Sequence, residues 1–261
     1  MTLSDGFLEL VVRPEDSIPV ELLAFEIARH AHPDLDIQDS MRVLDGFAAG
    51  CAEPTVDSVC DFLFVECGFT GNTRNYYDPD NSLLDIVIES RRGIPISLAV
   101  VVIAVGSRLG VGFHGIGLPG HFLVGIDDRP GFYIDAFGGG QLLETGGVRA
   151  LFHRLHGADS RFHESMLVPA GPHAIARRML GNLDAMYAAN RDLRSRLWAT
   201  TLRAAIPGAS LEEEAEVAAA HAALGSLDCA AQTLEDLSER APEPVARNYL
   251  AVAARWRSQL N

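Results

Sequence analysis

Apolar positions recur every three or four residues through the first ninety residues of the chain, which is the spacing of helices that bury one face. The pattern predicts helices at residues 20–31, 37–51, 56–66 and 83–90. A segment rich in Gly, Asn, Asp and Pro, residues 68–82, interrupts it and predicts a long ordered loop. We expect Asn81 or Ser82 to cap the helix that follows this loop, because short polar side chains accept hydrogen bonds from the first helical N–H groups.

The middle of the chain changes from helical to alternating spacing. Residues 96–109 are apolar nearly all round, which predicts a helix buried inside the domain. Three short segments that read as strands follow, at residues 113–119, 121–127 and 131–137, and the turn residues 128–131 join the last two as a hairpin. Helices followed by an antiparallel sheet indicate an α+β domain.

Beyond residue 172 the sequence becomes rich in alanine and carries helical hairpins, with small residues at the crossings and proline near the ends. This pattern predicts two or three degenerate helical repeats, too few for a long solenoid. The boundary is expected at residues 168–172. The predicted organisation is therefore an α+β domain over residues 1–168 and an all-α helical region over residues 172–261.

Composition and charge exclude several classes of function. The 261 residues carry a formal net charge of −14 without a basic tract, so nucleic acid would be repelled. No lysine is present, which excludes a Schiff-base lysine, a pyridoxal-phosphate anchor and a phosphate-loop lysine. The longest apolar run, residues 94–105, is too short to cross a bilayer, and the four cysteines lack disulfide or metal spacing. We expect a soluble, cytoplasmic protein with free thiols, no membrane association and no cofactor.

His121 and Asp135 are the leading candidates for chemistry. If the turn pairs the strands around Ile126 and Phe132, both side chains can lie on one face of the hairpin. A carboxylate that accepts from one imidazole nitrogen leaves the other nitrogen free to act as a base. The spacing therefore predicts an acid–base pair, with a hydrogen bond that merely stiffens the hairpin as the alternative.

Seven segments, in order, give the chain a resemblance to a known family: "IARHAHPDLD", "GFTGN", "NSLLDIVIESRRGIPISLAVVV", "RLGV", "LPGHFLVG", "YIDAFGGG" and "RRMLGNLDAMYAANRD". They resemble the bacterial SirB-type transglutaminase-like family, from about Val20 to the C-terminus. The resemblance implies a transglutaminase/papain-like core followed by tetratricopeptide-like helices. In the wider transglutaminase and papain-like pattern, a catalytic Cys opens the buried helix, and His and Asp follow on strands; His121 and Asp135 match these two.

The resemblance places the nucleophile at about Pro95, and proline cannot supply a thiol. Proline is well suited to the first turn of a helix, so the usual Cys-dependent intermediate is not expected. Ser97 is a candidate replacement nucleophile, although its simpler role is a hydroxyl at the helix start. Cys67 is another candidate if the loop that follows it folds over the site, although a lone Cys is more often a small buried apolar group.

Substrate contacts are expected from Asn81, Arg91 and Arg92, which flank the same helix start, and an arginine fork there could hold a carboxylate. Solvation at the surface is the alternative for both arginines. His153 and His156 share a helix face, but no further ligands converge with them, so no metal site is predicted.

Two functions remain open from the sequence. The first is acid–base chemistry by His121 and Asp135 on a small polar substrate, as hydrolysis, elimination or cyclisation, without a covalent cysteine intermediate. The second is a non-catalytic pseudo-transglutaminase scaffold whose C-terminal helices bind a protein partner in regulation.

Overall fold

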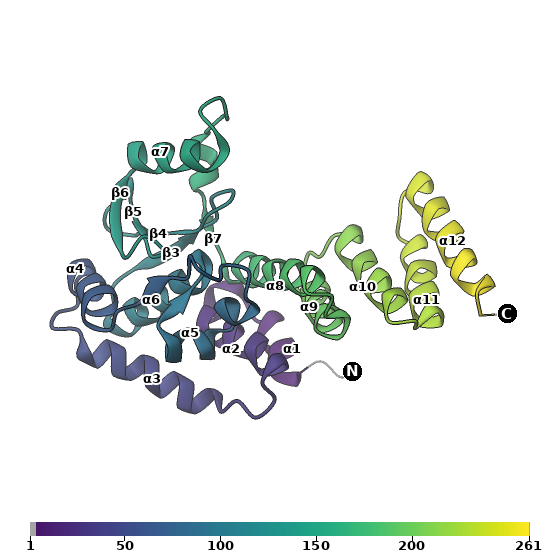
Figure 1. The fold of residues 1–261 in the computed structure, drawn as a ribbon, viewed down its shortest axis with the longest axis horizontal. Helices are drawn as coiled ribbons and strands as arrows, with labels where there is room; N and C mark the ends of the chain where they lie inside the picture. Colours follow the sequence, from purple (N-terminus) through teal and green to yellow (C-terminus); the bar gives the residue numbers. More distant parts are fainter. Residues whose placement is uncertain (1–3, 261) are drawn as a thin grey trace. The chain divides into compact units, whose positions relative to one another are not determined.

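The structure is a computed structural model that describes residues 4–260. Two compact units make up the chain (Figure 1). One comprises residues 13–179, and the other combines the residues up to Val12 with those from Leu180 onward. Among residues 4–260, no helix combines the length and the apolarity needed to span a bilayer.

The unit of residues 13–179 contains five helices before its main sheet: α2 (Val20–Ala31), α3 (Ile37–Gly50), α4 (Val56–Cys60), α5 (Leu84–Ser90) and α6 (Pro95–Leu109). These agree with the periodicity of the sequence, except that α4 continues as a π-helical segment, Asp61–Glu66. The expected cap of α5 by Asn81 or Ser82 is wrong. The N-cap of α5 is Leu83, because both polar residues belong to a 3-10 turn, Pro79–Ser82, that ends just before it.

The main sheet has five antiparallel strands in the order β6 (Gln141–Glu144), β5 (Phe132–Asp135), β4 (Leu123–Ile126), β3 (Phe113–Ile116) and β7 (Pro169–Ala170). In the β4–β5 hairpin, Val124 lies opposite Ile134 and Gly125 opposite Tyr133. This register matches the one predicted from the turn. The edge strands β6 and β7 were not predicted.

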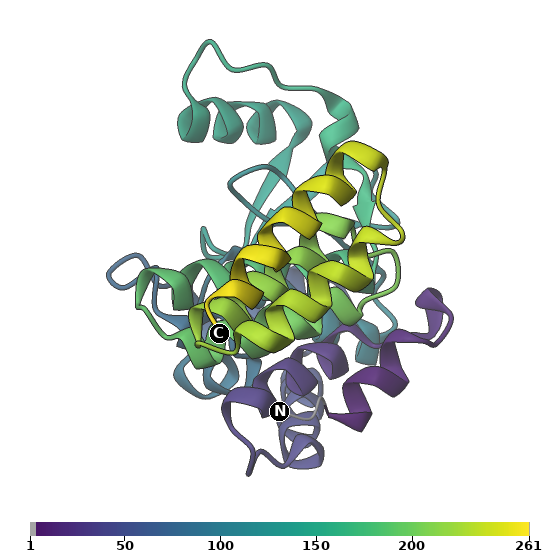
Figure 2. The ribbon, with the colours of Figure 1, turned by 90° about the vertical axis from the view of Figure 1, so that its right-hand side faces the viewer.

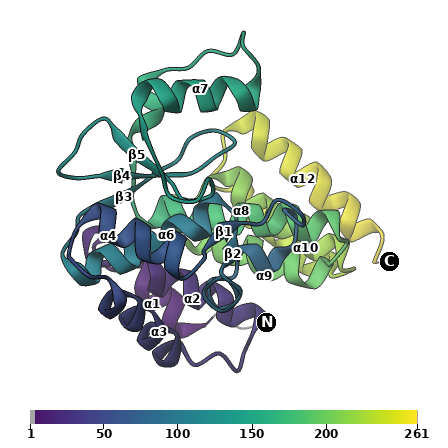
Figure 3. The same ribbon diagram turned by 60° about the vertical axis from the view of Figure 1, so that its left-hand side comes forward.

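The sheet lies between α6 and α7 (Thr145–His156), which occupy opposite sides of it (Figures 1 and 3). Helix α6 is buried over most of its surface, as its uniform apolarity predicts, and packs on β3 and β4. From α7, Val148, Leu151 and Phe152 pack with Ile116 and Leu123 of the strands. The central strands are therefore covered on both faces, which is why β4 is apolar throughout.

A separate two-stranded parallel sheet joins the loop after α4 to the start of α6. It pairs β1 (Thr70–Gly71) with β2 (Arg92–Gly93). Helix α5 stops before β2 because Arg91 adopts a left-handed conformation, with φ of 60°. This pairing was not expected from the sequence, since each strand has only two residues.

The second unit contains the C-terminal helices α9 (Leu193–Ala205), α10 (Leu211–Ala223), α11 (Leu227–Ser238) and α12 (Glu243–Ser258), together with α1 (Asp5–Val11). Helices α10, α11 and α12 lie side by side as hairpins (Figure 2). Ser210 and Glu213 form a reciprocal capping pair that fixes the start of α10. Helix α8 (Pro172–Ala189) contains the division between the units, after Met179, whereas the change in composition falls at residues 168–172.

Candidate active site

His121 and Asp135 meet at the beginning of β4 and the end of β5. Nε2 of His121 lies 2.8 Å from Oδ1 of Asp135, and the two side chains are only 7% and 8% exposed. The pair is offset by two positions along the ladder, which is a diagonal contact on one face of the hairpin. The contact expected from the hairpin is therefore present.

The carboxylate of Asp135 is held as an anion. Burial raises its pKa, but the hydrogen bond and charge of His121 and the N–H groups of Gly138 and Phe137 bring the pKa below its ordinary value. Gly138 donates to Oδ1 at 3.0 Å, so this oxygen accepts two hydrogen bonds. A neutral imidazole beside this anion keeps its proton on Nε2, which leaves the lone pair on Nδ1. Nδ1 makes no hydrogen bond to any residue within 4–260.

The loop of residues 68–82 covers the pair through an aromatic side chain. The ring of Phe137 meets the imidazole of His121 edge-on, with 6.0 Å between centroids, and Tyr76 from the loop meets Phe137 in the same way at 5.8 Å. Gly71 also lies against this ring, because an added Cβ would be 2.6 Å from it. The loop therefore closes over the pair by packing on Phe137.

Arg178 of α8 holds the backbone that carries His121. Its two terminal nitrogens donate to the carbonyl oxygens of His121 at 2.6 Å and Leu118 at 2.9 Å. Its guanidinium also lies over the ring of Phe122, 5.4 Å from the centroid. Sequence reasoning missed Arg178, Tyr76 and Phe137. The sequence places two arginines together at 177–178, and nothing in the helical period shows which of them reaches the strand.

Comparison of the sequence with known proteins shows the family to which the chain belongs. A family model described as the transglutaminase-like superfamily matches residues 18–181, well over half of the 261-residue chain. The chain belongs to the transglutaminase-like superfamily. The expectation of a transglutaminase-like α+β domain is confirmed at this level.

Curated relatives of this transglutaminase-like chain come from bacteria and from animals. A UPF0162 protein of Xylella fastidiosa (strain 9a5c) is 34% identical over 187 residues, which are 67% of this chain and 66% of that protein. A UPF0162 protein of Pseudomonas aeruginosa is 32% identical over 124 residues, covering 48% and 45% of the two chains. F-box only protein 21 of Mus musculus is 33% identical over 97 residues, 34% of this chain but 16% of its own length. The chain thus spans just under two thirds of the length of the Xylella relative. No solved structure gives a significant match.

The start of α6 is where the resemblance places a nucleophile in a transglutaminase-like fold. Pro95 is its first residue, and Ser97 follows two residues later in the same first turn, with its hydroxyl fully buried. Oγ of Ser97 lies 2.6 Å from the carbonyl oxygen of Asn81 and 3.1 Å from that of Ile94, and it accepts from the Ile94 N–H at 3.1 Å. These bonds use the hydroxyl to fasten the helix start to the loop.

Asn81 is buried and organises the covering loop. Its Nδ2 donates to the carbonyl oxygens of Asn75 at 2.6 Å and Tyr76 at 3.2 Å, and its Oδ1 accepts from Nδ2 of Asn72 at 2.9 Å. The side-chain amide therefore joins three positions of the loop that covers His121. These hydrogen bonds hold the loop in its conformation.

The remaining candidate site residues, Cys67, Arg91 and Arg92, lie in three different environments. The Cys67 thiol is half-buried, and burial raises its pKa despite the nearby charge of Arg91, so it is not an activated thiolate. The guanidinium of Arg91 lies 4.4 Å and 5.0 Å from the ring centroids of Phe47 and Phe69. Arg92 is exposed in β2. The structure does not bring the two arginines together as a fork.

A second His–Asp pair, which sequence reasoning missed, lies on the same sheet. Nδ1 of His114, on β3, is 2.6 Å from Oδ1 of Asp127, just beyond β4. The sequence contains a signal for this pair. His114 and Asp127 lie on neighbouring predicted strands, and the argument that places His121 and Asp135 on one face applies to them as well. Among residues 4–260, no three His, Cys, Asp or Glu side chains gather as ligands for a metal ion.

Proposed function

We propose that this transglutaminase-like chain is of the SirB type and carries out acid–base chemistry with His121 and Asp135, without a covalent cysteine intermediate. The observation that carries the proposal is the buried 2.8 Å contact between Nε2 and the carboxylate, which leaves Nδ1 without a hydrogen-bond partner among residues 4–260. An imidazole oriented in this way accepts a proton at Nδ1 and returns it to a leaving group. Hydrolysis, elimination and cyclisation all need this transfer.

Each component has a defined role in such a reaction. Asp135 holds the tautomer and stabilises the imidazolium that forms after proton transfer, because its lowered pKa keeps it ionised. Arg178 fixes the backbone of His121 through two carbonyl oxygens. The nucleophile for hydrolysis would be water, because Pro95 has no reactive group and the hydroxyl of Ser97 is bonded to backbone.

The burial of the pair restricts the substrate. With 7% of the His121 side chain exposed, only a small polar molecule can bring an acidic proton to Nδ1 unless the covering loop moves. Phe137 and Tyr76 would supply the apolar side of the site. Asn81, Arg91 and Arg92 remain proposed substrate contacts, with Arg92 the exposed one among them.

The same burial favours a second candidate function, a pseudo-transglutaminase scaffold in which the pair only stabilises the hairpin. The tetratricopeptide-like C-terminal helices would then bind a protein partner. The hairpins α10–α11 and α11–α12 carry a small apolar core of their own, which includes Ala218, Leu234 and Tyr249. A binding surface needs such a rigid base.

The two functions can be separated with one set of variants. The purified chain is incubated with a pooled extract of small metabolites, and consumed and formed masses are measured for the parent, His121→Gln, Asp135→Asn and His163→Gln. His163 is exposed and lies outside the pair, so it is the matched histidine control. Turnover that is lost about 100-fold or more in His121→Gln but kept in His163→Gln supports acid–base chemistry. Turnover that is equal in all four proteins, or absent from the parent, contradicts it and leaves the scaffold.

A further inference from the structure

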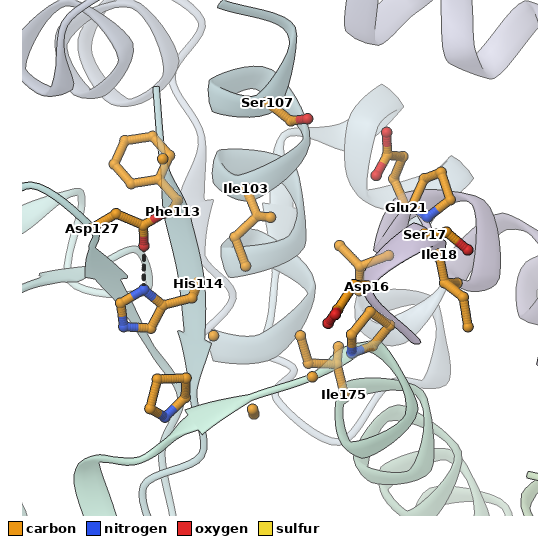
Figure 4. Close-up of a pocket in the computed structure, with 18 of the residues that line it drawn as sticks. Asp16, Ser17, Ile18, Glu21, Ile103, Ser107, Phe113, His114, Asp127 and Ile175 are labelled. Carbon is orange, nitrogen blue, oxygen red and sulfur yellow. Dashed lines mark hydrogen bonds and ion pairs between the residues drawn. The ribbon is translucent and has the colours of Figure 1, made fainter. Parts of the chain in front are cut away.

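A cavity of about 680 Å³ lies in the unit of residues 13–179, apart from the His121 site (Figure 4). It is open to solvent and is lined by the segment that leads into α2, the last turns of α6, strand β3, and the region from β7 into α8. None of its lining residues belongs to the His121–Asp135 pair or to the loop that covers it. Small-molecule sites commonly occupy about 300–1,000 Å³, so the volume suits a ligand.

The second His–Asp pair forms one wall of this cavity (Figure 4). His114 is 29% exposed and Asp127 is 59% exposed, so a ligand can reach both. Nε2 of His114 makes no hydrogen bond to any residue between 4 and 260. Because Nε2 lies against Gly125, the group that this wall presents to a ligand is the carboxylate of Asp127.

Two glycines make room for the pair on the strands. A Cβ at Gly125 would lie 2.1 Å from the ring of His114, and one at Gly112 would lie 2.4 Å from the carboxylate of Asp127. Any side chain at either position would push the pair away from the wall. The flat placement of the pair thus depends on the absence of a Cβ at both positions.

Charge and apolar surface in the cavity point to one class of ligand. Asp16 and Asp127 are acidic, Glu21 is already paired with Arg108, and no arginine is among the described residues that line the cavity. Figure 4 draws Asp16 on the other side of the cavity from the His–Asp pair. An anion would be repelled here, whereas a cation gains a charge-assisted hydrogen bond.

We propose that this cavity binds a small molecule that carries a protonated amine on an apolar body. The amine hydrogen-bonds to the carboxylate of Asp127, which Nδ1 of His114 also contacts. The apolar body packs against Ile103 and Ile175, which line the cavity between the strand and the helices. This site is separate from the proposed acid–base function and does not depend on it.

Protein-observed NMR titration of the full chain with 2-phenylethylammonium tests the proposal at about 0.15 M salt, where long-range attraction to the acidic chain is screened. The titration is repeated with 3-phenylpropanoate, which has the same ring and the opposite charge. Asp127→Asn removes the proposed contact. Asp128→Asn removes the same charge one residue later, outside the cavity lining.

The expected result is saturable shifts of the amide signals of residues 112–115 with the amine and none with the carboxylate. Asp127→Asn should weaken the apparent affinity about fivefold or more, and Asp128→Asn less than about twofold, since only the first removes a direct ionic hydrogen bond. Three results would overturn the proposal: no shifts at residues 112–115, equal weakening by the two variants, or equal binding of the carboxylate. A spectrum otherwise like that of the parent shows that each variant is folded.

Discussion

Replacing Asp135 with asparagine removes the charge of the buried pair and keeps its shape. Both hydrogen bonds, from His121 and Gly138, end on Oδ1, which the asparagine carbonyl can reproduce. A hydrogen bond to a charged group contributes about 1.5–3 kcal/mol and a neutral one about 0.5–1.5 kcal/mol. Two bonds that each change from charged to neutral, at about 1–1.5 kcal/mol each, predict a loss of about 2–3 kcal/mol of unfolding free energy near pH 7.

The pH dependence of this loss follows from the lowered pKa of Asp135. A carboxyl whose pKa is lower in the folded state stabilises the fold above its unfolded pKa, about 3.9 for Asp, and loses this contribution as the pH falls through the folded pKa. Asparagine does not titrate. The difference between parent and Asp135→Asn should therefore shrink as the pH falls below about 4.

Urea titration followed by NMR signal intensities of the β4 and β5 amides, at pH 7 and pH 3, measures the effect. Tryptophan fluorescence would not report on the site, since Trp198 and Trp256 both lie in the other unit. Asp128→Asn is the control, because that carboxylate is exposed and should change stability by less than about 0.5 kcal/mol. A difference near zero at pH 7, or one of equal size at pH 3, would refute the reasoning.

Two further predictions concern other parts of the same unit. Gly125→Ala should displace the ring of His114 and lower the free energy of unfolding by about 1–3 kcal/mol, seen as a lower melting temperature. Gly146→Ala is the control and should be neutral or stabilising, because nothing lies within 4 Å of the added Cβ. Equal effects of the two variants would contradict the packing argument. Burial raises the pKa of the Cys60 thiol to about 12. Iodoacetamide at pH 8 should therefore modify the exposed Cys229 well before Cys60, which peptide mass spectrometry measures. Rapid labelling of Cys60 would contradict this prediction.

The helices and the central hairpin could be predicted because their signals are local. Helix α6 is apolar all round, and it begins and ends within one residue of the expected range. The contact of His121 with Asp135 follows from a turn of fixed length, because a hairpin pairs positions whose numbers have a constant sum. The superfamily could be recognised because motifs in both halves keep their order.

The remaining features depend on contacts between distant segments, which periodicity does not contain. Strands β1 and β2 have two residues each, too few for an alternating pattern, and they pair across 20 intervening positions by numbering. Arg178 reaches the backbone of His121 from a helix 57 residues later. Asn81 was expected at a helix start, but the tertiary contacts of its amide with the loop determine its place.

The side-chain amide of Asn81 joins three positions within the covering loop. Since one side chain bonds to Asn72, Asn75 and Tyr76 together, these contacts should break in one cooperative event rather than residue by residue. Backbone amides across residues 72–81 would then share one opening free energy in native-state hydrogen exchange. That opening rate would set an upper limit on how often a molecule too large for the closed loop could reach His121.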